Sequence, residues 1–224
     1  MKSYEPALPA RFADRFEAGR LLADRVARLN LRAPVVLGLP RGGIPIAREI
    51  AKRLGVTAEA FVARKIGVPG FPEYGIAAIA EGLDEIILSP QAAQLGFDAA
   101  QLASMARAEY RELERRVAAY RGDRALPDME GREVVIADDG LATGVTARAA
   151  LRSLRQHSPS RLIFAAPACA PDSVVNLSAT GLADDVVYVI APADFEAVGQ
   201  WYVDFEQLDD ADVVRLLRAG DPQD

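Results

Sequence analysis

The chain has 224 residues, of which 50% are hydrophobic and 26% are charged, a composition typical of a globular protein with a buried core. The formal net charge of −6 argues against a nucleic-acid-binding protein that works through a broadly basic surface, so an anionic ligand would need a local cationic site. The single cysteine, Cys169, cannot form an internal disulfide, and no apolar run is long enough to span a bilayer. We therefore expect a cytoplasmic protein with no signal peptide and with neither nucleic acid nor membrane as a partner.

The first elements in chain order are an amphipathic helix and two apolar segments. Residues 11–30 place apolar side chains at helical spacing, which predicts an N-terminal helix. The segment PVVLGL at 34–39 is typical of a buried strand, and Gly43–Leu54 is typical of a helix closed by a glycine. The segment AEAFVARKI at 58–66 predicts a second strand. A long loop is expected over 67–82, where proline and glycine are frequent and charges are few.

The second half of the chain continues the alternation of helices and strands. The predicted elements are a helix at 98–121, a strand at 133–138, a helix at 147–156, strands at 161–168 and 185–192, and a helix at 210–219. Apolar strands that alternate with helices favour an α/β fold, with a mostly parallel sheet covered by helices on both faces. In such a sheet, ligands bind beyond the carboxyl ends of the strands.

The segment VVIADDGLATGVT, Val134–Thr146, contains the most specific motif. Asp138 and Asp139 follow a predicted strand, and a turn of small residues leads into a helix. Backbone N–H groups at a helix N-terminus, together with the hydroxyls of Thr143 and Thr146, are suited to holding a phosphate. Two carboxylates beside a phosphate need partners of their own, such as ribose hydroxyls or hydrated magnesium. The alternative is an ordinary acidic strand end followed by a helix cap.

The segment LGLPRGGIPIA is a second candidate for binding phosphate. Its glycine spacing matches a P-loop, but Ile44 and Pro45 stand where that motif requires Lys and Ser or Thr, which excludes a nucleoside triphosphatase of this kind. Arg41 could instead supply a planar cationic fork to a pyrophosphate, and Gly42 and Gly43 could present backbone N–H groups to it. The alternative is a tight turn with an arginine that faces solvent.

Together these motifs resemble the type I phosphoribosyltransferases, whose signature is an apolar run, two acidic residues, a short turn and Thr-Gly-x-Thr. The chain further resembles a bacterial group of predicted phosphoribosyltransferases of unassigned substrate, over about Arg11 to Arg218, in the segments RFADRFEAGRLLADRV, LGLPRGGIPIA, RKIGVPGFPEYGIAAIAEG and FEAVGQWYVDF. The resemblance implies a Rossmann-like fold in a single domain over 1–224. Its core would lie at about 33–191, and a small hood would come from about 1–32 and 192–224.

The resemblance also implies the reaction. A phosphoribosyltransferase moves the 5-phosphoribosyl group from 5-phosphoribosyl-1-pyrophosphate (PRPP) to a nitrogenous base and releases pyrophosphate, with Mg²⁺ as cofactor, in nucleotide metabolism and nucleoside salvage. Asp138 and Asp139 would hold the ribose hydroxyls and the metal, directly or through water. Arg41 and Lys65 would act on the pyrophosphate, and the loop at 67–82 would close over the reaction. The remaining PRPP-binding residues would be Ala142, Thr143, Gly144, Val145, Thr146, Gly42, Gly43 and Arg64.

The acceptor base is less well defined by the sequence. Ala142 stands where the 6-oxopurine members of the family have an aspartate, which argues against guanine or hypoxanthine. The C-terminal segment resembles the base-contacting segment of those same members, although one residue is inserted. In that interpretation Phe195, Val198 or Trp201 would stack on a ring, and Asp204 would accept a hydrogen bond from an amino group. Alternatively, these aromatic residues pack the C-terminal helix onto the sheet.

Several alternatives remain open at the level of sequence. A non-catalytic regulatory protein could bind PRPP or a nucleotide through the same motifs, and a flavodoxin-like mononucleotide binder could share the sheet. Arg41, Lys65 and the long loop favour an enzyme, because a sensor needs no shielding from water. Glu73 and Glu81 flank that loop, and either could act as an acid or a base. The resemblance is also compatible with a homodimer.

Overall fold

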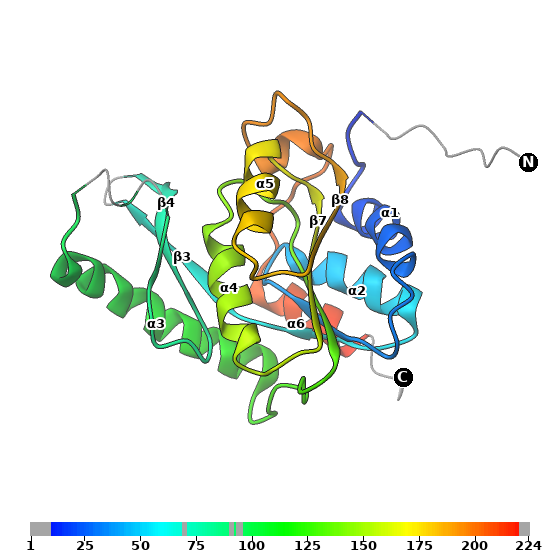
Figure 1. The fold of residues 1–224 in the computed structure, drawn as a ribbon, viewed down its shortest axis with the longest axis horizontal. Coiled ribbons are helices and arrows are strands. Elements are labelled where there is room, and N and C mark those ends of the chain that lie inside the picture. The colour runs from blue at the N-terminus through cyan, green and yellow to red at the C-terminus, as the bar shows by residue number, and fades with distance from the viewer. Residues whose placement is uncertain (1–9, 69–70, 90–91, 93–95, 220–224) are drawn as a thin grey trace, which may run out of the picture.

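The computed structural model describes residues 10–68, 71–89, 92 and 96–219, with the backbone alone for 71–74 and 99. Its strands and helices alternate along most of the chain (Figure 1). In chain order they are α1 (Arg15–Ala27), β1 (Val35–Gly38), α2 (Gly43–Leu54), β2 (Ala58–Ala60), β3 (Ala63–Val68), β4 (Phe71–Ala80), β5 (Ile87–Leu88), α3 (Ala99–Arg121), β6 (Glu133–Ala137), α4 (Val145–Arg155), β7 (Arg161–Ala168), α5 (Pro171–Ala179), β8 (Asp185–Ile190), the 3-10 helix η2 (Val198–Trp201) and α6 (Asp210–Arg218).

The central sheet has five strands in the order β2-β1-β6-β7-β8, and every neighbouring pair is parallel. This confirms the predicted α/β class. After β1 the chain adds β2 on one side, and it later returns to place β6 on the other side of β1. The strand order therefore reverses between β1 and β6. Ligands of doubly wound sheets bind at such a switch point, outside the carboxyl ends of the strands.

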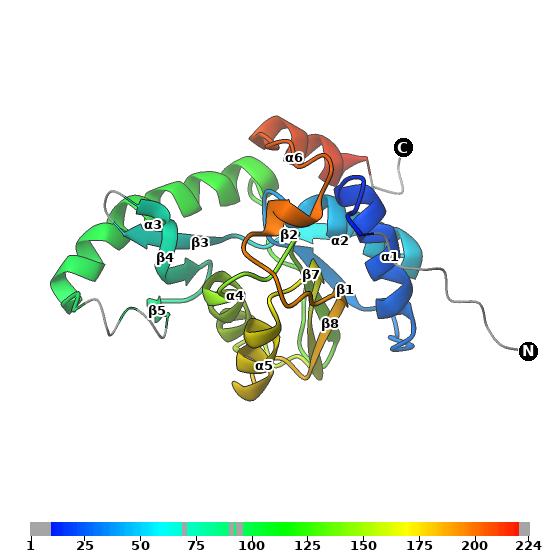
Figure 2. The same ribbon diagram turned by 90° about the horizontal axis from the view of Figure 1, so that it is seen from above.

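Both faces of the central sheet are buried, as the continuous apolar strands predict. Val134 and Ile136 of β6 pack in a cluster with α4, whereas Val135 between them packs in a second cluster with α1 and α2. This is the period-two alternation of a strand. Figure 2 shows α1 and α2 on one side of the sheet and α4 and α5 on the other. The sequence pattern did not single out the short helix α5.

The prediction of one strand over 58–66 is wrong. The backbone N–H of Phe61 still bonds to the carbonyl of Gly38 in β1, at 3.0 Å, but the chain then leaves the central sheet. Oε1 of Glu81 accepts a hydrogen bond from the N–H of Val62 at 2.7 Å, which fixes this crossing. β3 begins one residue later in a separate antiparallel sheet of order β3-β4-β5. A continuous apolar run satisfies a buried strand in either sheet, so periodicity could not reveal the change.

The prediction of a long loop over 67–82 is also wrong, because β4 occupies most of that segment and pairs antiparallel with β3. Ala77 and Ile79 pack against α3, whereas Ala78 and Ala80 on the opposite face pack in the cluster that contains α4. Small apolar side chains suit a strand covered on both faces, and the glycines accompany a register irregularity in the hairpin. The hairpin and the first part of α3 project from the central sheet (Figures 1 and 2).

α3 and α6 pack together beside this hairpin. The long helix begins at the N-cap Asp98 with a capping box, which confirms the predicted helix. Within the helix, Nε of Arg116 forms an ion pair with Oε1 of Glu112 at 2.8 Å. The hydroxyl of Tyr120 donates to Oδ1 of Asp210 at 2.6 Å and so joins the end of α3 to the start of α6.

Within the described residues, no helix has the length and apolar character needed to cross a bilayer.

Candidate active site

The two acidic residues lie at the carboxyl end of β6, on the β6 side of the switch point. The backbone N–H of Asp138 donates to the carbonyl of Ala165 in β7 at 3.0 Å, which continues the sheet pairing. Oδ1 of Asp138 accepts from the N–H of Asp139 at 2.9 Å. On the other side, the N–H of Leu39 donates to the carbonyl of Ala137 at 2.8 Å, so the turn after β1 lies against the start of the acidic turn.

Burial raises the pKa of both carboxyl groups of this turn and of the nearby Cys169 thiol. Burial, and then the negative charge of Asp139, raises the pKa of Asp138. Burial also raises the pKa of Asp139, and the positive charge of Arg15 opposes that rise. Burial raises the pKa of Cys169 to about 12. The thiol is therefore neutral near pH 7, which agrees with a small core residue rather than a nucleophile.

The glycines after β1 bring the second predicted motif against the first. A Cβ atom added to Gly42 would lie 1.8 Å from Oδ2 of Asp139, and one added to Gly43 would lie 2.4 Å from the carbonyl oxygen of Ala137. Only residues without side chains allow this approach. Gly42 is also the N-cap of α2, so the positive end of that helix lies beside the acidic pair. The two motifs therefore converge at the switch point.

Arg41 precedes these glycines and is half-buried. The pKa of the Tyr120 hydroxyl is raised mainly by burial, and the positive charge of Arg41 is one of the charges that oppose this rise. The guanidinium of Arg41 therefore lies within electrostatic range of the C-terminal part of α3.

The predicted phosphate turn leads into the N-terminus of α4. Gly144 is the N-cap and has a φ of 74°, in the left-handed region that favours glycine. Ala142 and Thr143 are exposed, Thr146 is half-buried, and Val145 is buried and anchors the start of the helix. The turn is tied to the connection between β7 and α5 by hydrogen bonds from Leu141 N to Ala168 O (2.9 Å), from Ala170 N to Leu141 O (2.8 Å) and from Ser173 Oγ to Ala142 O.

The sequence pattern predicts Arg64 and Lys65 at the end of a strand of the central sheet. They lie instead near the start of β3, in the antiparallel sheet. Arg64 pairs with Glu109 of α3 at 2.5 Å. The stem of Lys65 lies across β4, because a Cβ added to Gly75 would be 2.5 Å from Cδ of Lys65. The same Cβ would be 3.5 Å from a methyl group of Val145. The hairpin thus brings Lys65 beside the first residue of α4 by a route that the sequence did not indicate.

The candidate base-binding residues lie on a segment that passes over the acidic turn, residues 195–206, which we call the crossing segment. The rings of Phe195 and Trp201 stack at 6.3 Å with an interplanar angle of 23°. A Cβ added to Gly140 would lie 2.5 Å from a methyl group of Val198, so Val198 packs directly on the residue that follows the acidic pair. These side chains pack against the cluster of α1, α2 and the central sheet, whereas the apolar residues of α6 belong to a separate cluster, which argues against the alternative that they anchor the C-terminal helix.

The same segment is hydrogen-bonded to the acidic turn and to the start of the described chain. The hydroxyl of Tyr202 donates to the carbonyl of Asp139 at 2.6 Å. The N–H of Asp204 donates to the carbonyl of Ala13 at 2.9 Å. The carboxylate of Asp204 is exposed and accepts from the N–H of Glu206 at 3.0 Å. Asp204 therefore lies at the rim of the segment.

Arg15, which no sequence motif marks as a site residue, contacts the acidic pair directly. Its Nε lies 2.8 Å from Oδ2 of Asp139, and its Nη1 donates to the carbonyl of Glu206 at 2.9 Å. Its guanidinium also lies over the ring of Phe205, 3.9 Å from the centroid. Arg15 and Asp139 are 124 positions apart, and the helical pattern around Arg15 gave no sign of a site. Only the packing of α1 beside the sheet edge brings them together.

The family of the chain follows from comparison with known proteins. Residues 13–182 match the phosphoribosyl transferase domain. The chain belongs to the phosphoribosyl transferase family. The matched range includes both motifs at the switch point and the hairpin that bears Lys65. It ends before the segment that crosses the acidic turn.

Similar proteins support this assignment over most of the chain. Two curated relatives from strains of Mycobacterium tuberculosis, both named as candidate phosphoribosyl transferases, are 43% identical over 206 residues, which is 92% of this chain and 46% of theirs. The chain thus spans about half the length of these relatives. The crystal structure of TT1426 from Thermus thermophilus is 42% identical, with a TM-score of 0.77 over 94% of this chain and 99% of that one.

The donor set of this phosphoribosyl transferase domain fits magnesium in one particular way. Among the described residues, no group of three or more His, Cys, Asp or Glu side chains could hold a metal ion. Mg²⁺ commonly uses only one or two carboxylates and completes its octahedron with water and substrate phosphates. The adjacent carboxylates of Asp138 and Asp139 suit that mode, whereas a cage made of protein ligands alone is not present in this part of the chain.

Of the two glutamates considered as an acid or base, only Glu81 has a described side chain, and it lies in a separate buried ion pair. The side chain of Glu73 lies outside the described residues. Glu81 is 8% exposed and is bound within a buried ion pair, in which Nη2 of Arg121 lies 2.5 Å from its Oε2. Nη1 of Arg121 also donates to the carbonyl of Ala60 at 3.1 Å. Glu81 therefore joins β2, β4 and α3, and these contacts do not support a role for it as an acid or base.

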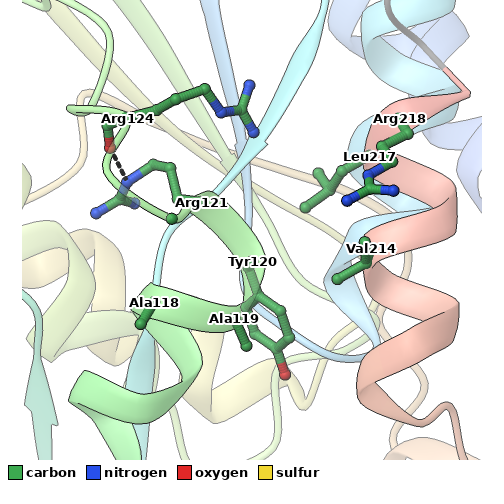
Figure 3. A pocket seen from close by; sticks show the side chains of 9 residues that line it. Ala118, Ala119, Tyr120, Arg121, Arg124, Val214, Leu217 and Arg218 are labelled. Carbon is green, nitrogen blue, oxygen red and sulfur yellow. Dashed lines mark hydrogen bonds between the residues drawn. The ribbon is translucent and has the colours of Figure 1, made fainter.

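A cavity of about 490 Å³ lies between the end of α3 and α6, and the described residues that line it include none of the predicted site residues (Figure 3). Two of its arginines are already engaged. Arg121 donates to the carbonyl of Arg124 at 3.0 Å and binds Glu81, and Arg124 itself pairs with Glu59 at 3.0 Å. This cavity is therefore separate from the candidate active site.

Proposed function

We propose that this protein is a magnesium-dependent phosphoribosyltransferase, which transfers the 5-phosphoribosyl group of PRPP to a nitrogenous base and releases pyrophosphate. The observation that carries the proposal is the convergence of two phosphate-type turns and an acidic pair at one switch point. Gly42 and Gly43 lie against Asp139 and Ala137, and the turn that begins α4 follows directly. A phosphorylated pentose with a pyrophosphate has anionic groups at both ends and a diol between them, which matches this order.

In the proposed reaction the bond between the anomeric carbon and pyrophosphate breaks, and a bond to the acceptor nitrogen forms. Negative charge develops on the departing oxygen. Arg41, the N–H groups of Gly42 and Gly43, and Lys65 would stabilise that charge in a site where water is scarce. Bound Mg²⁺ would neutralise part of the pyrophosphate charge. The close approach of the glycine turn to the acidic pair supports this assignment of the leaving-group side.

The sugar would be held by the acidic turn and by the turn that begins α4. Asp138 and Asp139 would accept hydrogen bonds from the ribose hydroxyls and would hold the metal, directly or through water. The backbone from Ala142 to Val145, together with the hydroxyls of Thr143 and Thr146, would bind the 5-phosphate at the start of α4. Arg64 is already paired with Glu109, so its role would be to position α3 or the hairpin rather than to bind PRPP directly.

The acceptor would enter on the side of the crossing segment. Phe195, Val198 and Trp201 would form its apolar wall, and Asp204 at the rim would accept a hydrogen bond from an amino group. Because Ala142 supplies no carboxylate, the acceptor nitrogen would have to present its own lone pair or pass its proton to another group. In this proposal the chain forms one domain, in which its terminal segments cover the ligand edge of the core.

The decisive experiment incubates the protein with MgCl₂ and PRPP against a panel of purines, pyrimidines and simple amines, and follows the release of pyrophosphate. We expect release with one acceptor class and none in the parallel reaction with the Asp139→Asn variant. A reaction without acceptor measures hydrolysis. Binding of PRPP without release on any acceptor would favour the regulatory alternative, and absence of both binding and release would contradict the proposal.

A further inference from the structure

Arg15 joins three groups that come from distant parts of the chain. Its Nε contacts Oδ2 of Asp139 at 2.8 Å, its Nη1 donates to the carbonyl of Glu206 at 2.9 Å, and its guanidinium lies over the ring of Phe205. The side chain is only 11% exposed. Arginine is rarely this buried unless its charge is paired. The contacts therefore account for a cation placed beside the candidate ribose site.

The contact with Arg15 determines which oxygen of Asp139 faces a ligand. Oδ2 lies between Arg15 and Gly42, since a Cβ added to the glycine would be 1.8 Å from Oδ2 but 3.1 Å from Oδ1. The hydrogen bond from Arg15 is therefore made to the oxygen nearer to the glycine. Oδ1 would then be the oxygen that meets a ribose hydroxyl or water on a metal ion.

The remaining contacts of Arg15 hold the crossing segment. The carbonyl of Glu206 and the ring of Phe205 belong to its last part, and the ring of Phe205 lies 5.0 Å from that of Tyr202. Tyr202 in turn donates its hydroxyl to the carbonyl of Asp139. Arg15 and Tyr202 therefore connect the same acidic residue to the segment that bears the candidate base-binding residues.

We infer that Arg15 is a positioning residue for both substrates. It holds the carboxylate of Asp139 for the ribose, and it holds residues 202–206 in place beside the acceptor. This inference rests on the proposed function. A guanidinium can do both at once, because its planar fork donates in two directions while its face stacks on a ring. A lysine could reach Asp139 but could not make all three contacts.

The test compares Arg15→Met and Arg15→Lys with the matched control Arg20→Met, which removes an exposed arginine from the same helix. Calorimetry measures the affinity for PRPP with MgCl₂, and the fluorescence of Trp201, the single tryptophan, reports on the crossing segment. Its indole nitrogen is buried and its ring stacks on Phe195, so displacement of the segment changes the emission. The KM for the acceptor found in the panel completes the comparison.

We expect Arg15→Met to weaken PRPP binding by about tenfold or more, the loss typical of a hydrogen bond to a charged group, and to shift the emission of Trp201. Arg15→Lys should restore PRPP affinity to within about threefold of the wild type, because one charged contact is regained. We nevertheless expect both Arg15→Met and Arg15→Lys to show a shifted Trp201 emission and a raised KM for the acceptor. Arg20→Met should match the wild type in every measurement.

Each other outcome identifies what has failed. If the wild type binds PRPP and Arg15→Met binds it equally well or more tightly, the inference is overturned and the proposed function stands. If Arg15→Lys behaves like Arg15→Met in all measurements, Arg15 is merely structural and the inference is likewise overturned. If the wild type does not bind PRPP, the proposed function fails, and an unchanged Trp201 emission in Arg15→Met would then refute the contact with the segment as well.

Discussion

Gly42 shows how one missing side chain can define the candidate site. Asp139 occupies the space that a Cβ at position 42 would need, with Oδ2 only 1.8 Å from that point. Such an approach cannot be relieved by a small rotation, because the carboxylate is also held by Arg15. The acidic residue and the glycine turn therefore depend on each other for their positions.

We predict that Gly42→Ala removes PRPP binding while the protein stays folded. The methyl group would force Asp139 out of its contact with Arg15 and would displace the turn after β1. Calorimetric titration with PRPP and MgCl₂ should show at least about a hundredfold loss of affinity, since both the carboxylate and the turn move. Circular dichroism should show native secondary structure. Retained affinity in a folded variant would contradict the proposed role of this turn.

At the residue scale, the sequence was sufficient to predict the local motif but not the contacts that distant residues make with it. The motif from Val134 to Thr146 indicated its own strand, turn and helix, because all its parts are neighbours in the chain. Arg15 and Tyr202 reach the same acidic residue only through tertiary packing, so no local pattern marked them. Gly75 and its contact with Lys65 depend on the hairpin pairing, which the sequence analysis had interpreted as a loop.

At the scale of elements, the pair formed by Glu81 and Arg121 joins the two sheets and α3. The two residues are 8% and 9% exposed, and the pair also satisfies the N–H of Val62 and the carbonyl of Ala60. A buried ion pair of this kind costs much to break, because one charge is left without a partner. It lies at the point where the chain passes from the central sheet into the hairpin.

We predict that Arg121→Met destabilises the protein by about 3–5 kcal/mol, the usual cost of leaving one member of a buried pair unpaired. Urea unfolding monitored by circular dichroism measures the change. The control is Arg124→Met, which removes an exposed arginine of a neighbouring ion pair and should cost no more than about 1 kcal/mol. Equal losses in the two variants would show that burial of the pair is not the cause.

The ion pairs of Glu112 on α3 predict a pH dependence of stability. Hydrogen bonds from Arg115 and Arg116 lower the pKa of Glu112 from 4.5 to about 2. A carboxyl with a lowered pKa stabilises the folded state above its unfolded pKa, and that contribution disappears as the pH falls from about 4.5 towards 2. The carboxylate is 30% exposed, so solvent screening limits its contribution.

The variant Glu112→Gln should therefore be less stable than the wild type by about 0.5–1 kcal/mol at pH 7, as for a partly exposed pair, and the difference should shrink at pH 3. Urea unfolding at the two pH values measures both differences. Glu114→Gln, on the exposed face of the same helix, is the control and should show little change at either pH. A deficit for Glu112→Gln that is as large at pH 3 as at pH 7 would contradict this account.

At the scale of the whole molecule, the fold class could be predicted, whereas the arrangement of the hairpin could not. Apolar strands alternating with helices specify a parallel sheet and place its ligand edge, because every strand must be covered on both faces. The segments 58–66 and 67–82 are apolar or rich in small residues in a way that fits several structures. Their outcome depended on α3 and α4, which enclose β4, and on Glu81, which fixes the crossing.

The candidate site unites distant segments, so its ligand should stabilise the entire fold. At a PRPP concentration of about 100 times its Kd, binding adds about 2.7 kcal/mol to the free energy of unfolding. For a protein of this size that corresponds to a rise in Tm of about 5–10 °C. Calorimetric or fluorescence melting with MgCl₂ and PRPP measures it. Asp139→Asn should show a clearly smaller rise, and an equal rise in that variant would argue against ribose binding by Asp139.

The packing of Val198 on Gly140 has an evolutionary consequence. The strands of the central sheet carry the acidic pair and both phosphate-type turns, whereas the stretch that would face the acceptor belongs to neither sheet. Substitutions between Phe195 and Trp201 would therefore change which nucleophile is accepted while leaving recognition of the sugar donor intact, because Tyr202 and Phe205, which contact Asp139 and Arg15, stay in place. Relatives would then differ in their products through substitutions in residues 195–201 alone, with the strands of the central sheet unchanged.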